Sequence, residues 1–206
     1  VQWKIVIIYI SLILIAMQVI GIYFIRTVEQ SFIDNFTETL NAQADSLAFN
    51  VEPYLSSVQS GERVAHDEIG ELIQNFMTLN NAGAQVIDQN GVIIGGSDSE
   101  KQLIGQKNVQ LEVNRALLGS RGNDIRSDSI SGQRLMVLAV PIENNDNQVL
   151  GAVYLWASMK DMYRTIRRIN GIFATGTVFA LLLTAGLGVL LSRSITNPVK
   201  AITEQA

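Results

Sequence analysis

The sequence contains no cysteine and only one histidine among its 206 residues. The absence of cysteine excludes a disulfide framework and a cysteine-ligated metal site. With His66 as the only histidine, no serine has a histidine relay and no zinc-ligand spacing exists, and the chain carries neither a P-loop nor a G-x-G-x-x-G motif. We interpret His66 as a surface residue at a helix start, with a metal-ligand or pH-sensing role as the alternative. We therefore expect no catalytic residue, no metal and no cofactor in this segment.

Charged residues are missing from two long apolar runs. Residues 5–25 and 171–191 each comprise 21 consecutive residues without Asp, Glu, Lys or Arg. As helices they are about 31 Å long, close to the roughly 30 Å of a bilayer's hydrocarbon core. Burying both in a soluble protein would need more chain than the 145 residues between them. We predict two transmembrane helices, the first an uncleaved signal anchor.

The region between these runs has the composition of a folded domain. Residues 27–170 carry 18 acidic and 11 basic side chains, a net charge of −7, which argues against nucleic acid as a partner. A heptad repeat of Ile33, Leu40 and Leu47 predicts a helix to about residue 58, with a kink or break near Glu52 because Pro53 follows. This stripe can pack on the domain core, pair with a second copy in a homodimer, or do both.

After a second expected helix at 67–79, the periodicity becomes that of strands. Two short β runs flank Asn90-Gly91, a strong hairpin signal. A loop at 99–110, a helix at 109–119 and strands at 123–130, 134–143 and 148–158 follow. The last two strands are apolar on both faces and are expected in the interior of the sheet. The predicted fold is α+β: a five-stranded antiparallel sheet with the N-terminal helices on one face, followed by a helix at 160–170 that continues into the second span.

Some side chains on the predicted strands are candidates for holding a small anionic or polar ligand, with ordinary packing and salt bridges as the alternative. They are Arg126, Arg134, Tyr154 and Trp156. The acidic residues Asp98 and Glu100 are weaker candidates for a cation site.

Small residues recur at every fourth position of the second apolar run. Such ladders let helix backbones approach closely in lipid, so we predict a helix–helix contact there. Its residues are Gly176, Ala180, Thr184 and Gly188.

The arrangement of span, α/β domain with a "VIDQNGVII" hairpin and "LIGQ" loop, and second span resembles a single Cache domain of a bacterial receptor, an extracytoplasmic relative of the PAS fold. The tail "SITNPVKAI" resembles the opening of a HAMP linker, with Ile195, Val199 and Ile202 at heptad spacing and Pro198 at a helix start. Because HAMP linkers are cytoplasmic, the resemblance implies that residues 26–170 lie outside the cell and both termini inside.

The implied boundaries are a cytoplasmic segment at 1–4, transmembrane helices at 5–25 and 171–191, a Cache domain at 26–170 and the start of a HAMP linker at 192–206. The charge count points the other way, since five basic residues flank the domain side of the runs and three flank the other side. That rule is weak for long loops. The five are Arg26, Lys160, Arg164, Arg167 and Arg168, and the three are Lys4, Arg193 and Lys200.

A closer resemblance is to the WalK (YycG, VicK) family of sensor histidine kinases. It rests on "MQVIGIYF" with Asp34-Asn35-Phe36 downstream, and on "RSITNPVKAIT" at the other end. The resemblance implies a dimeric kinase whose further domains bind ATP and Mg²⁺, phosphorylate a WalR-type response regulator and control cell-wall metabolism. It also implies an unknown extracellular ligand and membrane partners of the YycH and YycI type. The alternatives are a chemotaxis receptor, a diguanylate cyclase with the same front end, or a membrane scaffold.

Overall fold

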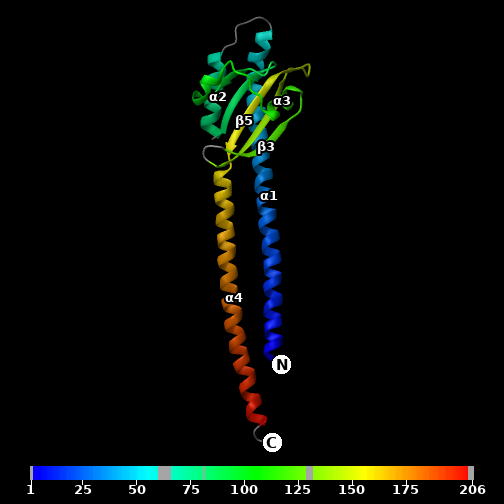
Figure 1. Cartoon of the computed structure of the whole chain (residues 1–206), viewed down its shortest axis with the longest axis vertical. Coiled ribbons are helices and arrows are strands. Elements are labelled where there is room, and N and C mark those ends of the chain that lie inside the picture. Colours follow the sequence, from blue (N-terminus) through cyan, green and yellow to red (C-terminus); the bar gives the residue numbers. More distant parts are fainter. Residues whose placement is uncertain (1, 60–65, 81, 129–131, 204–206) are drawn as a thin grey trace. The chain divides into compact units, whose positions relative to one another are not determined.

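The computed structural model describes residues 2–59, 66–80, 82–128 and 132–203. The chain forms two compact units: one is Ile33–Asp161, and the other joins the residues before Ile33 to those from Met162 onwards. The elements, in chain order, are α1 (Gln2–Gln59), α2 (His66–Asn80), β1 (Ala82–Asp88), β2 (Ile93–Gly96), the 3-10 helix η1 (Asp98–Leu103), α3 (Leu111–Leu117), β3 (Gly122–Ser127), β4 (Arg134–Glu143), β5 (Val149–Ser158) and α4 (Lys160–Thr203) (Figure 1).

The five strands form one antiparallel sheet in the order β2-β1-β5-β4-β3. β5 lies in the middle and pairs with β1 on one side and with β4 on the other. Its residues from Leu150 to Leu155 are all buried. A strand that is apolar on both faces is stable only where both faces are covered, which is why β5 takes the centre. The expected five-stranded antiparallel sheet, with β4 and β5 in its interior, is confirmed.

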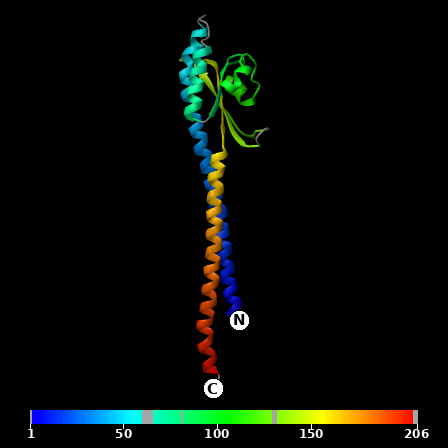
Figure 2. The ribbon, with the colours of Figure 1, turned by 90° about the vertical axis from the view of Figure 1, so that its left-hand side faces the viewer.

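Helices cover both faces of the sheet (Figure 2). The part of α1 in this unit and α2 lie on one face, where Ile69 and Ile73 of α2 pack against Gly95 of β2. Helix α3 lies on the other face, where Val113 and Ala116 enter a buried apolar cluster. The expected grouping of the N-terminal helices on one face is confirmed.

Pro53 lies inside α1, and the helix continues through it to Gln59. Of the expected kink or break near Glu52, the break is therefore wrong, and the kink stays a prediction. Val51 and Leu55 are buried, whereas Pro53 is exposed. Burial of two aliphatic side chains contributes about 3–6 kcal/mol. This offsets the cost of about 3 kcal/mol for a proline inside a helix.

The predicted hairpin at Asn90-Gly91 joins β1 and β2. Gly91 has a φ of 81°, which favours glycine. The carboxylate Oδ1 of Asp88 accepts hydrogen bonds from the backbone N–H of Asn90 at 2.9 Å and of Val92 at 2.8 Å. Asp88 therefore fixes the turn through an Asx-type pattern. The segment after β2, expected to be a loop, begins with the 3-10 helix η1.

Helices α1 and α4 each contain a segment that is long and apolar enough to cross a membrane. These segments are Ser11–Ser57, with a mean hydropathy of 1.9, and Lys160–Leu187, with a mean hydropathy of 1.6. Phe173 of α4 packs so closely on Gly21 of α1 that a Cβ at position 21 would overlap its ring. Thr177, one turn further along α4, is buried and donates its hydroxyl to the carbonyl of Phe173 at 2.9 Å.

A helix–helix contact through the predicted small-residue ladder stays a prediction. Ala180 and Thr184 are half-buried and follow Phe173 and Thr177 at helical spacing. Gly176 is exposed, and no described atom lies within 4 Å of a Cβ built on it. The side-chain surroundings of Gly188 lie outside the described residues. The contact between α1 and α4 within one chain therefore centres on Phe173 and Gly21. A search for small residues at every fourth position does not find such a pair.

Replacing Gly151 by alanine is expected to destabilise the domain by about 1–3 kcal/mol, the usual cost of overpacking. A Cβ at this position of β5 would overlap the carbonyl oxygen of Ile87 in β1. Gly70→Ala is the matched control, because no described atom lies within 4 Å of a Cβ there and alanine favours a helix over glycine by about 1 kcal/mol. Urea unfolding followed by tryptophan fluorescence measures both changes. Equal midpoints for the two variants would contradict the prediction.

Candidate ligand-binding surfaces

Two of the predicted ligand contacts, Tyr154 and Trp156, lie on the face of the sheet that α3 covers. Their ring centroids are 5.8 Å apart, with an angle of 36° between the planes. Tyr154 belongs to the buried cluster beneath α3, and Trp156 is half-buried at its margin. The indole of Trp156 lies on Gly83 of β1, where a Cβ would overlap it. Position 83 therefore needs glycine for close approach rather than for its backbone angles.

Arg126 of β3 lies on the same face and is held by the start of α3. Its Nη2 is 2.5 Å and 2.6 Å from the two carboxylate oxygens of Glu112. Its Nη1 donates to Gln110 Oε1 at 2.5 Å, and its Nε donates to Asp124 Oδ2 at 3.1 Å. The Glu112 side chain is only 4% exposed. This ion pair therefore fastens α3 to the edge strand β3, and it shields a carboxylate that would be costly to bury alone.

The same contacts favour the ionised forms of Asp124 and Arg126. The hydrogen bond from Arg126 lowers the pKa of Asp124, and the hydrogen bond from the backbone N–H of Ile125 lowers it further. The hydrogen bond to Asp124 raises the pKa of Arg126, and the Glu112 carboxylate adds to this effect. The positive charge of Arg126 is thus neutralised inside the chain.

The four predicted ligand residues do not form one site. Residues that pair directly across an antiparallel sheet point to the same face, and successive residues alternate. Arg126, Tyr154 and Trp156 pair with Leu135, Ala139 and Val137 of β4, which places them together on the α3 face. Arg134 precedes Leu135 and points to the opposite face, where it is exposed. A ligand role for any of the four stays a prediction.

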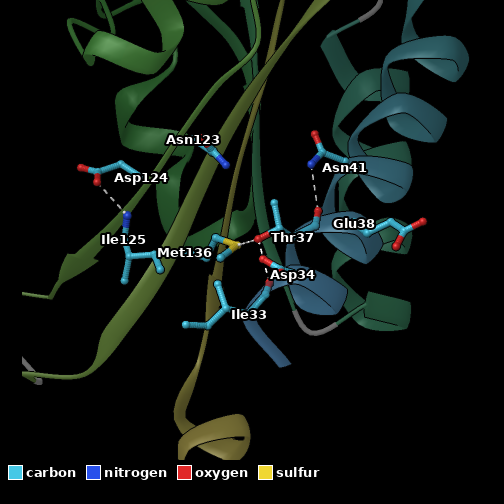
Figure 3. Close-up of a pocket in the computed structure, with 9 residues that line it drawn as sticks. All are labelled: Ile33, Asp34, Thr37, Glu38, Asn41, Asn123, Asp124, Ile125 and Met136. Carbon is cyan, nitrogen blue, oxygen red and sulfur yellow. Dashed lines mark hydrogen bonds between the residues drawn. The ribbon is translucent and has the colours of Figure 1, made fainter. Parts of the chain in front are cut away.

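A pocket of about 590 Å³ lies on the opposite face, between α1 and strands β3 and β4 (Figure 3). Ile33, Ile125 and Met136 form its apolar part. Its polar lining comes from α1 and from the start of β3. The polar residues are Asp34, Thr37, Glu38, Asn41, Asn123 and Asp124.

The polar groups of this pocket are already ordered by the chain. Thr37 Oγ1 donates to the carbonyl of Ile33 at 2.8 Å and lies 3.4 Å from the sulfur of Met136. Asn41 Nδ2 donates to the carbonyl of Thr37 at 2.9 Å. In Figure 3 the carboxylates of Glu38 and Asp124 point away from the centre of the pocket. With an apolar floor and no Lys or Arg in its lining, the pocket suits a neutral or cationic amphipathic ligand.

A second groove, of about 700 Å³, runs between α1 and α2. Leu47, Leu72 and Phe76 supply its apolar lining, and the rest is mainly polar. Leu40 and Leu47 are 2% and 3% exposed, so the predicted stripe packs on the domain's own core, and Ile33 is half-buried. Use of this stripe in a dimer stays a prediction.

Several predicted residues lie where side chains are not described. His66 begins α2 and Asp98 begins η1, but the side chains of both, and of Glu100, are outside the described residues. The same holds for Ile195, Pro198, Val199 and Ile202, whose backbone is part of α4. Among the described side chains, no group of three or more His, Cys, Asp or Glu residues is placed to hold a metal ion.

The pocket shown in Figure 3 was not predicted from the sequence. A signal for its α1 wall exists, because Asp34, Thr37, Glu38 and Asn41 recur at intervals of three and four beside the apolar stripe. Such a polar stripe on an amphipathic helix ordinarily marks a face in solvent. Only the sheet topology reveals that the edge strand β3 lies opposite it.

This fold defines a class: a sensor domain of the Cache type in a membrane protein with two candidate spans. The sensor domain of *Escherichia coli* DcuS superimposes with a TM-score of 0.54 at 17% identity, over 66% of this chain and 98% of that chain. The sensory domain of the *Campylobacter jejuni* chemoreceptor Tlp3 with isoleucine bound gives a TM-score of 0.55 at 15% identity, over 69% and 60%. At such identities the likeness establishes the fold alone.

Sequence comparison identifies the family. Residues 68–157 match the family model of the WalK sensor protein kinase Cache domain. The chain is 32% identical over 209 residues to the sensor histidine kinase WalK of *Bacillus subtilis* strain 168, covering 100% of this chain and 34% of the relative. It is also 32% identical over 207 residues to the sensor protein kinase WalK of *Staphylococcus epidermidis* RP62A, covering 98% and 34%. The chain belongs to the WalK sensor kinase family, and it spans about a third of the length of these relatives.

Arg126→Ala is expected to destabilise the sensor domain by about 3–5 kcal/mol, because it leaves the Glu112 carboxylate buried without a partner. The double variant Arg126→Ala/Glu112→Ala should be less destabilised than the sum of the two single variants, because it also removes the unpaired charge. Urea unfolding of all four proteins gives the coupling free energy. Additive effects would show that the ion pair does not hold α3.

Proposed function

We propose that this chain is the extracellular sensor and transmembrane signalling portion of a two-component sensor histidine kinase that controls cell-wall metabolism. The observation that carries the proposal is the 32% identity to WalK of *Bacillus subtilis*, which extends over the whole chain and not only the Cache domain. Residues 26–170 face the outside, residues 5–25 and 171–191 cross the membrane, and both termini are cytoplasmic. The curated relatives reported above are kinases, so no observation favours a chemotaxis receptor, a diguanylate cyclase or a scaffold.

The route for the signal is the direct connection between the central strand and the second span. Met159 alone separates β5 from α4. Its side chain is fully buried, and its backbone N–H donates to the carbonyl of Arg134 in β4 at 2.9 Å. A ligand that shifts β5 therefore moves the first turn of α4. The input biases the output only by its differential affinity for the two arrangements.

On the cytoplasmic side, α4 enters a HAMP linker at residues 192–206, where Ile195, Val199 and Ile202 pack in a parallel dimer and Pro198 marks its first helix. The domains beyond it bind ATP and Mg²⁺ and phosphorylate a WalR-type response regulator. Membrane partners of the YycH and YycI type pair with the two spans. These assignments rest on family membership, and the sequence that follows in the native gene distinguishes a kinase from the alternatives.

Inserting two glycines between Ser158 and Lys160 in the full-length kinase is expected to uncouple the sensor from kinase output. The insertion breaks the rigid path from β5 through Met159 to α4. Autophosphorylation in membrane vesicles should therefore be the same whether the input to the sensor domain, a ligand or a partner protein, is present or absent. The same insertion in the exposed β4–β5 turn, at Asp146, is the control and should leave the response intact. A response that survives the first insertion would rule out this route.

Besides the stripe of Ile33, Leu40 and Leu47 predicted from the sequence, a homodimer can use the exposed face of α1, which we favour because Leu40 and Leu47 are buried within the domain. Phe49 on that face is 80% exposed, and Ala42, one heptad earlier, is exposed as well. Cysteines at positions 42 and 49 should therefore form disulfide-linked dimers in vesicles under mild oxidation. Cysteine at the buried Leu47 is the control and should not. Crosslinking at position 47 alone would place the dimer on the other side of the helix.

A further inference from the structure

Three arginines flank the two uncharged runs, in the unit that joins the residues before Ile33 to those from Met162 onwards. Arg26 directly follows the uncharged run of α1, and Arg167 and Arg168 come shortly before the uncharged run of α4. All three side chains are exposed. Among residues 26–32 and 162–170 there are four arginines and one carboxylate, Glu29. This short zone is strongly positive although the whole chain carries a net charge of −4.

The contact between Gly21 and Phe173 brings these arginines to one level. Within this unit α1 and α4 run antiparallel to each other (Figures 1 and 2). Arg26 is five residues after Gly21, and Arg168 is five residues before Phe173. At 1.5 Å per residue both lie about 7.5 Å from the contact in the same direction along the helices. Arg26, Arg167 and Arg168 therefore form a basic collar at one height.

The collar has no partner among the described residues. Arginines of the sensor domain differ: Arg121 pairs with Asp45 at 2.8 Å, and Arg126 pairs with Glu112. No described carboxylate pairs with Arg26, Arg167 or Arg168. Close to them, the side-chain oxygen of Asn170 is buried and accepts no hydrogen bond from a described group. The three collar arginines thus differ from Arg121 and Arg126 of the sensor domain, whose charges are paired within the chain.

We propose that the collar binds the phosphodiester groups of anionic phospholipids in the leaflet that faces the sensor domain. A guanidinium donates two parallel hydrogen bonds to a phosphate, and its long apolar stem lets it reach the headgroups from the end of a span. Each basic side chain near an anionic surface favours binding by about 1 kcal/mol, or about fivefold. Binding to anionic headgroups also explains why basic residues gather on the sensor-domain side of the runs, although the positive-inside rule expects them on the cytoplasmic side.

The test compares spin-labelled phosphatidylglycerol with spin-labelled phosphatidylcholine in phosphatidylcholine vesicles that contain residues 1–206. Electron paramagnetic resonance gives the fraction of each lipid held at the protein. The chain is expected to prefer phosphatidylglycerol by about fivefold or more, and 1 M salt should weaken this preference by screening. The triple variant Arg26→Gln/Arg167→Gln/Arg168→Gln should lose it, and the triple Lys variant should keep most of it.

Arg115→Gln is the matched control, since Arg115 is an exposed arginine of α3 and its loss changes the net charge equally per site. It should leave the lipid preference unchanged. A wild-type chain without preference, or an equal loss per charge in the control, would overturn the proposal. A site for free phosphate would also overturn it. In that case inorganic phosphate, but not chloride at equal ionic strength, would displace the bound spin-labelled lipid, and the chain would show no preference between the two lipids.

Discussion

The position of β5 is the constraint on which the rest of the structure depends. It is buried on both faces from Leu150 to Leu155, so it must lie between two partner strands and between two helical layers. Strands β1 and β4 therefore pair with β5 on its two sides, and β2 and β3 are the edge strands. Because α4 begins two residues after β5 ends, the most constrained strand of the sensor domain is also the one joined to the second span.

Electrostatics divides the chain in the same way as packing does. In the sensor domain, Arg126 is surrounded by Glu112, Asp124 and Gln110, so its charge serves the cohesion of α3 and β3. Beside the two uncharged runs, Arg26, Arg167 and Arg168 are exposed and have no partner among the described residues. The first arrangement stabilises a fold in water, where an unpaired buried carboxylate is costly. The second suits an anionic environment that lies outside the protein.

Elements with a clear period were predictable from the sequence, because burial of one face fixes both the period and the element. The hairpin at Asn90-Gly91, the interior strands β4 and β5 and the helix after them are examples. The predicted break near Pro53 was wrong because the cost of a proline inside a helix is local and visible in the sequence. The burial of Val51 and Leu55, which offsets this cost, depends on tertiary packing. The separation of Arg134 from Arg126 and the pocket beside Met136 depend on register, which no single segment encodes.

Both faces of the sheet are linked to α4 through β5. Tyr154 and Trp156 present one face of β5 to the α3 side, and Val153 and Leu155 present the other face to the α1 side. The pocket beside α1 contacts β4 through Met136, which pairs with Ala157 of β5. A ligand on either face therefore acts on a strand whose neighbours restrict it to small shifts. The identity of the ligand site and the route of the signal are thus separate questions, since the direct covalent connection from this sheet to α4 is Met159 whichever face the ligand contacts.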